Sequence, residues 1–372
     1  MKPTHLTAAV KLSKQTTTVI EGEGQNMKRA LALVVALACV VALAAIAGRA
    51  DAASSKSSAG SLSGAGSSFV FPLISAWIPA LGSAYDLNVS YSPIGSGGGI
   101  AAVTARTVDF GATDAPLSPD QFTACKGCVE IPWALSATSI PINLPGVNCI
   151  VKLTGAIIAD IYLGKITSWD DAQIKAINGS CNLTGQKITP VYRSDNSGTT
   201  YNFTDFLSAV NPEWKSKLGR GVNAQWPAGV GAKGSSGVAG VLTKTVGAIG
   251  YVDVAYALKN KLRFASIKNA SGKFATPGLR GISAAAATLP KTITGNGELS
   301  IVNPAKGNPL AYPISTFTYV IVPTSSSKAA DLRKMVYWTV TSGQKLGPKL
   351  LFQPLPKQVQ AFDYKQIKQI QG

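Results

Sequence analysis

The sequence predicts an α/β fold arranged in two lobes. Strand-like segments alternate with helical ones, as at residues 87–91 and 98–107 and again at 188–192 and 197–210. The roughly 310 residues that follow residue 63 exceed what a single hydrophobic core usually holds, so two lobes are expected. In sheets of this kind, ligands bind where the ends of strands lead into helices.

Local patterns place the individual elements. Apolar residues at helical spacing follow Phe69, alternation marks the strands, and Thr154 and Asp170 are candidate helix caps. Pro190 favours an edge or the start of a strand. The sequence therefore predicts strands at 87–91, 140–144 and 188–192, and helices after residue 69 and at 98–107, 154–162, 170–177 and 197–210.

Residues 1–52 carry the pattern of a secretory signal peptide. Lys28 and Arg29 precede an apolar stretch at 30–48, and Ala50-Asp-Ala52 follows as a small-x-small cleavage site. Met27 begins this pattern, so residues 1–26 are interpreted as an over-long gene-start extension. A Ser/Gly-rich linker at 53–63 comes next. We expect a periplasmic or otherwise extracytoplasmic protein; the alternative is an uncleaved membrane anchor, because the apolar stretch nearly spans a bilayer.

Histidine is absent from the expected mature chain, because the single histidine, His5, precedes the cleavage site. This excludes Ser-His-Asp and Cys-His catalysis and any metal site with imidazole ligands. The remaining carboxylates form no visible cluster of metal ligands. We therefore expect no enzyme, no metal site and no cofactor.

Four cysteines remain in the mature chain, and an even number in an exported protein favours two disulfides. Three pairings are open, and the sequence does not choose among them. The simplest joins Cys125 to Cys128 and Cys149 to Cys181. For the Cys-x-x-Cys pair, a structural staple is favoured over a redox site, because its surroundings are polar and turn-like.

The charge balance favours a small anionic ligand over nucleic acid. The chain has a net charge of +17, but its lysines are scattered and form no stripe with aromatic residues. A diffuse positive field concentrates small anions near the protein, and it also suits an acidic habitat.

Three loop-to-helix junctions are rich in glycine and hydroxyl residues: Gly64-Ala-Gly-Ser-Ser-Phe69, Gly95-Ser-Gly-Gly-Gly-Ile100 and Arg193-Ser-Asp-Asn-Ser-Gly-Thr-Thr200. Free N–H groups and the positive end of the helix dipole favour an anion at such places. Each junction alone is more often simple capping. A charged pair adds to them: Asp114 ends a strand-like segment, and Arg193 has Asp195 two residues on to orient its guanidinium. Together they predict an oxyanion site.

Eight short motifs in order along the mature chain resemble one family. They lie at residues 64–69, 94–99, 107–117, 161–170, 193–199, 226–234, 247–252 and 312–315. They are similar to the PstS family, the phosphate-binding subunits of bacterial ABC phosphate importers. The resemblance implies a two-lobed periplasmic binding protein of type II, with a hinge and a ligand cleft between the lobes. Residues 266–304 match least and are expected to be a variable loop region.

The resemblance also implies roles for individual residues. Asp114 accepts the proton of the phosphate, Arg193 pairs with its oxygens, and Asp195 holds Arg193. The phosphate-binding residues carried over are Ser68, Phe69, Ser96, Asp114, Arg193, Ser197, Gly198 and Thr199. Ser68 stands where the family usually has Thr, and Gly97 where it often has Ser; both changes keep the backbone donors.

We expect lobe 1 to comprise 64–138 and 316–372, and lobe 2 to comprise 139–315. The expected partners are inorganic phosphate and an ABC permease of the inner membrane, the expected state is a monomer, and no nucleic acid is expected. A receptor for another oxyanion (sulfate, molybdate or an organic phosphate) and a secreted phosphatase-like or scavenging protein are the alternatives.

Overall fold

The computed structural model describes residues 60–305 and 308–372. The predicted signal peptide at 1–52, His5 and most of the predicted linker therefore lie outside the described residues. Residues Ala59–Gly372 form one compact unit. Within the described ranges, no helix is long and apolar enough to cross a membrane.

The first sheet has six strands in the order β10-β4-β14-β3-β1-β2. β1 runs parallel to both β2 and β3, and β14 pairs antiparallel with β3 and β4. The strands are β1 (Gly60–Gly66), β2 (Leu87–Ser92), β3 (Phe110–Thr113), β4 (Cys128–Ser139), β10 (Val252–Asp253) and β14 (Ser315–Pro323).

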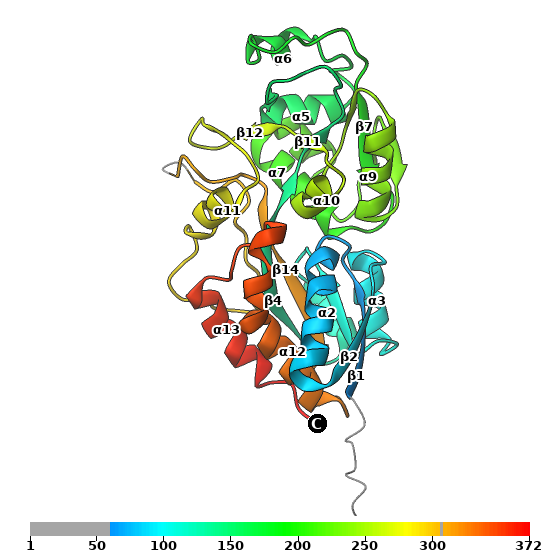
Figure 1. The fold of residues 1–372 in the computed structure, drawn as a ribbon, viewed down its shortest axis with the longest axis vertical. Coiled ribbons are helices and arrows are strands. Elements are labelled where there is room, and N and C mark those ends of the chain that lie inside the picture. Colours follow the sequence, from blue (N-terminus) through cyan, green and yellow to red (C-terminus); the bar gives the residue numbers. More distant parts are fainter. Residues whose placement is uncertain (1–59, 306–307) are drawn as a thin grey trace, which may run out of the picture. The chain divides into compact units, whose positions relative to one another are not determined.

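Helices flank this sheet, and Figure 1 shows α2 and α3 near β1 and β2, with α12 and α13 beside β4. α2 forms because Leu73, Trp77 and Leu81 recur at helical spacing and are all buried. The Trp77 indole N–H donates to the Gly343 carbonyl at 2.9 Å. The helices are α2 (Phe71–Tyr85), α3 (Ser96–Thr104), α4 (Pro119–Cys125), α12 (Ala329–Val340) and α13 (Lys357–Ile367), with 3-10 turns η2 (Ser342–Leu346) and η3 (Pro348–Leu350).

The second sheet has five strands in the order β11-β5-β9-β7-β8. They are β5 (Pro141–Ile142), β7 (Thr189–Arg193), β8 (Val230–Ala232), β9 (Ala248–Ile249) and β11 (Arg263–Phe264). The accompanying helices are α5 (Gly155–Tyr162), α6 (Ala172–Ala176), α7 (Gly198–Val210), α8 (Pro212–Lys217), α9 (Gly234–Lys244) and α10 (Val254–Lys259). A small third sheet has the strand order β13 (Phe274–Ala275), β12 (Ser266–Lys268) and β6 (Lys152–Leu153). Helix α11 (Leu279–Ala286) follows β13 in the chain.

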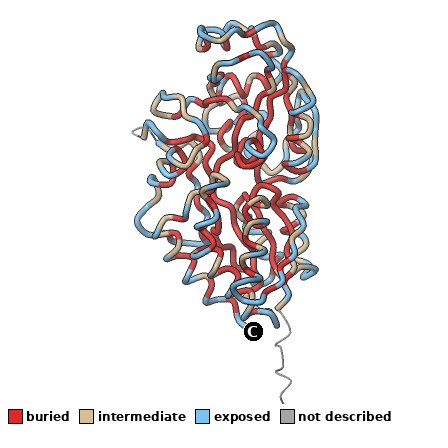
Figure 2. Tube along the Cα trace, viewed as in Figure 1, coloured by how far each residue is buried: buried red, intermediate tan, exposed pale blue. Residues whose placement is uncertain are grey.

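The two larger sheets are linked by β4 and β14, which pair antiparallel with Ser315 opposite Ala137. The chain leaves the first sheet after β4 and builds the second sheet, contributing the short strand β10 to the first sheet on the way, and returns at β14. The buried residues run through both parts in Figure 2. The predicted two-lobed α/β fold is confirmed. The lobe boundaries at 138/139 and 315/316 stay a prediction; β10, inside predicted lobe 2, pairs with the end of β4.

Most predicted elements are present, with shifted ends. The predicted helix at 98–107 spans Ser96–Thr104, because Arg106 has a φ of 58° and cannot continue a right-handed helix. The predicted strand at 140–144 shrinks to Pro141–Ile142. The predicted helix at 170–177 spans Ala172–Ala176 and is capped by Asp171.

The expectation of a loop region at 266–304 was wrong. Residues 266–304 were expected to be loop, yet they contain β12, β13 and α11. α11 buries Ile282, Ala285 and Ala286 on one face. Ile282 and Ala286 follow Leu279 at helical spacing, so the local pattern could have predicted this helix.

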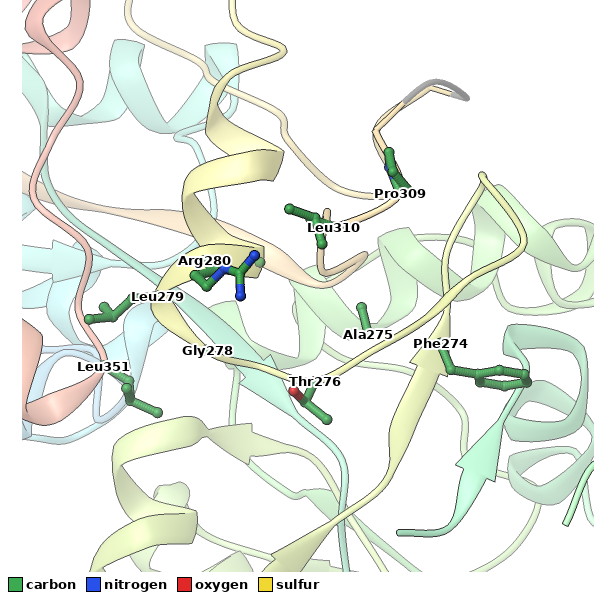
Figure 3. Close-up of a pocket in the computed structure, with 10 residues that line it drawn as sticks. Phe274, Ala275, Thr276, Gly278, Leu279, Arg280, Pro309, Leu310 and Leu351 are labelled. Carbon is green, nitrogen blue, oxygen red and sulfur yellow. The ribbon is translucent and has the colours of Figure 1, made fainter.

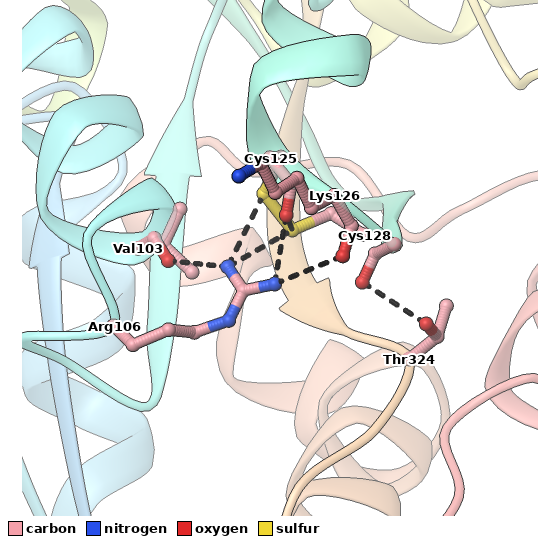
Figure 4. Close-up of a disulfide and its surroundings, with 7 residues drawn as sticks. Val103, Arg106, Cys125, Lys126, Cys128 and Thr324 are labelled. Atoms are coloured by element: carbon pink, nitrogen blue, oxygen red, sulfur yellow. Dashed lines mark hydrogen bonds between the residues drawn. A yellow bond between two sulfur atoms is a disulfide. The ribbon is translucent and has the colours of Figure 1, made fainter.

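The disulfides join Cys125 to Cys128 and Cys149 to Cys181, the simplest of the three open pairings. Figure 4 shows the guanidinium of Arg106 beside the first disulfide, where it donates to the carbonyls of Val103 and Cys125, each at 2.7 Å. The bridge and Arg106 together hold the end of α4 against the end of α3. This arrangement fits a structural staple.

Candidate functional site

Arg193 is the centre of a buried polar cluster between the two sheets. It is the last residue of β7, and only 1% of it is exposed. Its Nε donates to Asp195 at 2.8 Å and its Nη2 pairs with the same carboxylate at 2.5 Å. Although partial burial acts to raise the pKa of Asp195, the hydrogen bonds and charge of Arg193 lower it overall. The guanidinium is thus held in a fixed orientation by a two-point contact.

The remaining side of the guanidinium faces hydroxyl groups. Nη1 lies 3.3 Å from Thr199 Oγ1, at the start of α7, and 3.5 Å from Ser235 Oγ, at the start of α9. The backbone N–H of Arg193 donates to Tyr251 Oη at 3.0 Å, and that hydroxyl also contacts Thr200 Oγ1 at 2.8 Å. Both the backbone and the guanidinium group of Arg193 are therefore held by hydrogen bonds.

Asp114 is a buried carboxylate at the end of β3, 2% exposed. Ser67 Oγ donates to Asp114 Oδ1 at 2.5 Å and accepts the N–H of Phe69 at 3.0 Å. Burial raises the pKa of Asp114 to about 7, although the Ser67 hydrogen bond and the charge of Arg193 act to lower it. At neutral pH this carboxyl group is thus poised between its two protonation states.

Ser96 accepts hydrogen bonds from both lobes. Its Oγ, at the start of α3, accepts the Asp114 N–H at 3.3 Å from the first lobe and the Gly198 N–H at 3.1 Å from the second. The approach is close: a Cβ on Gly198 would lie 2.6 Å from Asp114 N and 2.7 Å from Ser96 Oγ. Only glycine fits there in this closed arrangement.

All the predicted site residues are buried except Asp195. Asp195, at 12% side-chain exposure, is the least covered. The hydroxyl of Ser197 accepts the Thr200 N–H at 3.2 Å, so it caps its own helix α7. The buried residues are Ser68, Phe69, Ser96, Asp114, Arg193, Ser197, Gly198 and Thr199.

Sequence reasoning missed a fourth helix start, at α9. Ser235 Oγ lies 3.0 Å from Ser68 Oγ, the Ser235 N–H donates to that same Ser68 oxygen at 3.0 Å, and the Gly234 N–H donates to Asp195 at 3.0 Å. The Lys-Gly-Ser-Ser sequence at 233–236, where α9 begins, resembles the other junctions in composition and could have been recognised. Ser67 and Tyr251 were also missed as site residues, although they lie in the motifs at 64–69 and 247–252.

The cluster brings one guanidinium, two carboxyl groups and several hydroxyl and backbone N–H groups together in a buried space. No group of metal ligands occurs in the part of the chain that the structure describes. Two α/β lobes that enclose such a cluster and are joined by two long strands define a two-lobed, type II solute-binding protein. Comparisons with known proteins identify the family within this class.

A family model described as a PBP superfamily domain matches residues 51–341. The phosphate-binding protein PstS of Xylella fastidiosa is 39% identical over 304 residues, covering 80% of this chain and 83% of the relative. That of Pasteurella multocida is 35% identical, covering 79% and 86%. The chain belongs to the PstS family of the PBP superfamily.

Solved structures show the same fold at low identity. A phosphate-binding protein from Stenotrophomonas maltophilia superposes with a TM-score of 0.65 at 22% identity, covering 82% of this chain and 93% of that one. A periplasmic phosphate-binding protein called PfluDING, solved with phosphate, gives a TM-score of 0.64 at 22% identity, covering 81% and 92%.

Proposed function

We propose that this protein is an extracytoplasmic receptor that captures inorganic phosphate and delivers it to an ABC-type phosphate importer. Relatives at 33% to 39% identity are phosphate-binding proteins named PstS. The observation that carries the proposal is that the buried carboxyl group of Asp114 lies within the electrostatic reach of Arg193, whose guanidinium is held by Asp195, beside the donors at the helix starts.

The proposed ligand position lies among these groups. Ser68, Phe69 and Ser96 contribute donors from the first lobe, and Gly198 and Thr199 contribute them from the start of α7. Ser197 contributes through its hydroxyl hydrogen, because its oxygen accepts the Thr200 N–H. Arg193, held by Asp195, supplies the charge for the phosphate oxygens. Donors at helix starts suit an anion because the N–H groups there lack helical partners.

Asp114 supplies selectivity for phosphate in this proposal. Phosphate near neutral pH still carries a proton, which an ionised carboxylate accepts in a strong charge-assisted hydrogen bond. Sulfate carries none, so the same carboxylate would face it as an unpaired acceptor, a mismatch of several kcal/mol.

Transport rather than catalysis follows from the same geometry. The proposed cycle is closure of the lobes over the ligand, docking of the closed form on a membrane permease, and release without any covalent step. The protein works as a monomer and takes no cofactor in this scheme. Its export rests on the signal-peptide pattern at 1–52.

Calorimetric titration of the mature protein with phosphate and with sulfate tests the proposal. Tight one-to-one phosphate binding without sulfate binding is expected at pH 8, where Asp114 is largely ionised. Equal affinities would remove the role given to Asp114. Tight sulfate binding with no phosphate binding would support the rival oxyanion receptor.

A further inference from the structure

A cavity of about 480 Å³ lies away from the polar cluster, beside the start of α11. Figure 3 shows its lining: β13 and the segment that leads into α11, the turn at Pro309 and Leu310, and Leu351 from the C-terminal part of the chain. Its volume falls in the range of about 300–1,000 Å³ that is usual for small-molecule sites. None of its lining residues belongs to the Asp114–Arg193 cluster.

The walls of the cavity are mostly apolar. Phe274, Ala275, Leu279, Leu310 and Leu351 contribute carbon side chains. Leu310 is 52% exposed, so an apolar side chain stands in solvent at the edge of the cavity. An occupant with a hydrocarbon part would cover this surface and remove it from water.

One charged group lines the cavity. Arg280, in the first turn of α11, has no hydrogen-bond or ion-pair partner among the described residues. In Figure 3 its guanidinium extends into the space between Leu310 and Thr276. An unpaired guanidinium matches a carboxylate in a two-point contact, and the first turn of a helix adds a favourable field for an anion.

The walls are anchored to the rest of the fold. The Leu351 carbonyl accepts from Ser136 Oγ at 3.1 Å, and Ser136, on β4, also donates to Asp253 at 3.2 Å. On the opposite wall, the Tyr312 N–H donates to the Gly281 carbonyl at 3.1 Å. Leu351 itself has a φ of 58°, a left-handed conformation that is uncommon for a leucine and is held by these surroundings. The cavity is therefore built from positioned elements before any occupant arrives.

We propose that this cavity is a second ligand site, which takes a small amphipathic carboxylate. The hydrocarbon part lies against Leu279, Leu310 and Leu351, and the carboxylate pairs with Arg280. This ligand class differs from the inorganic oxyanion proposed for the cluster, which is polar on every side.

The test is a calorimetric titration of the full mature protein, saturated with phosphate, using octanoate as the probe. Phosphate saturation keeps octanoate from occupying the first site. Saturable one-to-one binding with a dissociation constant below about 1 mM is expected for a ligand of this size. Octanol, which has the tail without the charge, and acetate, which has the charge without the tail, should each bind at least tenfold more weakly.

Two variants distinguish binding at this cavity from nonspecific binding elsewhere on the protein. Arg280→Gln should weaken octanoate binding by about tenfold or more, while the exposed Lys175→Gln on α6 should leave it unchanged. Both variants should keep phosphate affinity, which shows that they fold and that the first site is intact. Absence of saturable octanoate binding overturns the site. Equal binding of octanol, or an unaffected Arg280→Gln, overturns the carboxylate assignment.

Discussion

At the scale of single residues, the buried positions Asp114 and Ser235 have separate and testable parts in the cluster. Asp114 ends a strand-like segment in the sequence, and burial in the folded protein brings its pKa to about 7. Ser235 lies on the second lobe and touches both Ser68 and Arg193. Asp114 therefore affects which anion binds, and Ser235 affects the stability of the contact between the lobes.

Replacing Asp114 by Asn should lower the ratio of phosphate to sulfate affinity by at least about tenfold, because an amide can donate to either anion. In the parent protein, sulfate binding should strengthen as the pH falls from 8 to 6. The reason is that the Asp114 carboxyl gains a proton near pH 7 and can then donate. Calorimetry at both pH values measures these ratios. A variant that simply fails to fold in thermal melts would mean that Asp114 is structural.

Replacing Ser235 by Ala should weaken phosphate binding roughly three- to tenfold, since each lost hydrogen bond is worth about 0.5–1.5 kcal/mol. The next residue, Ser236, is exposed, so Ser236→Ala is the matched control and should bind as the parent does. Fluorescence or calorimetric titration of the two variants compares them. Equal affinities in both would show that the Ser68–Ser235 contact does not stabilise the bound state.

At the scale of secondary-structure elements, β4 and α13 each carry a buried carboxyl group without a cation beside it. Glu130 on β4 accepts the Leu117 N–H at 3.0 Å, and its other oxygen has no partner among the described residues. Burial raises its pKa to about 8, and the charge of Glu298 adds to the rise. Asp363 on α13 is buried with neither oxygen partnered in the described part of the chain, and burial raises its pKa as well.

These groups should make the fold more stable in acid than at slightly alkaline pH. Between about pH 4.5 and 8 the folded protein keeps the Glu130 proton that the unfolded chain releases, so the free energy of unfolding falls as pH rises through this window. Each unit of pKa difference corresponds to about 1.4 kcal/mol, so a loss of a few kcal/mol is expected. Urea unfolding at pH 5 and pH 8 measures it.

Glu130→Gln should flatten this pH dependence, whereas Asp120→Asn, at an exposed site in α4, should leave it unchanged. A stability that rises from pH 5 to pH 8 in the parent protein would contradict the assignment of protonated buried carboxyls.

At the scale of the whole molecule, the closed arrangement depends on direct contacts between the lobes. Ser96 and Ser68 of the first lobe meet Gly198 and Ser235 of the second. These contacts lie at the proposed ligand position, while the linking strands β4 and β14 run beside each other over nearly their full length. Ligand binding and lobe closure are therefore expected to be one event.

Gly198→Ala should block closure, because the added methyl group would meet Asp114 N and Ser96 Oγ at 2.6 and 2.7 Å. We expect phosphate affinity to fall by about a hundredfold or more, and the phosphate-induced decrease in radius of gyration to disappear in X-ray scattering. Gly240→Ala in α9, where a Cβ meets nothing within 4 Å, is the control and should close normally. Normal compaction of the Gly198 variant would show that the lobes close in another way.

The sequence by itself determined the alternation of strands and helices, the hydroxyl-rich junctions and the Arg193–Asp195 pair, because each of these depends on neighbours a few positions away. It did not reveal the α9 junction as part of the site or the disulfide pairing. Those features depend on contacts between residues far apart in the chain, such as Ser68 with Ser235 and Cys149 with Cys181. The raised pKa of Asp114 likewise arises from burial, and burial is a property of the assembled lobes.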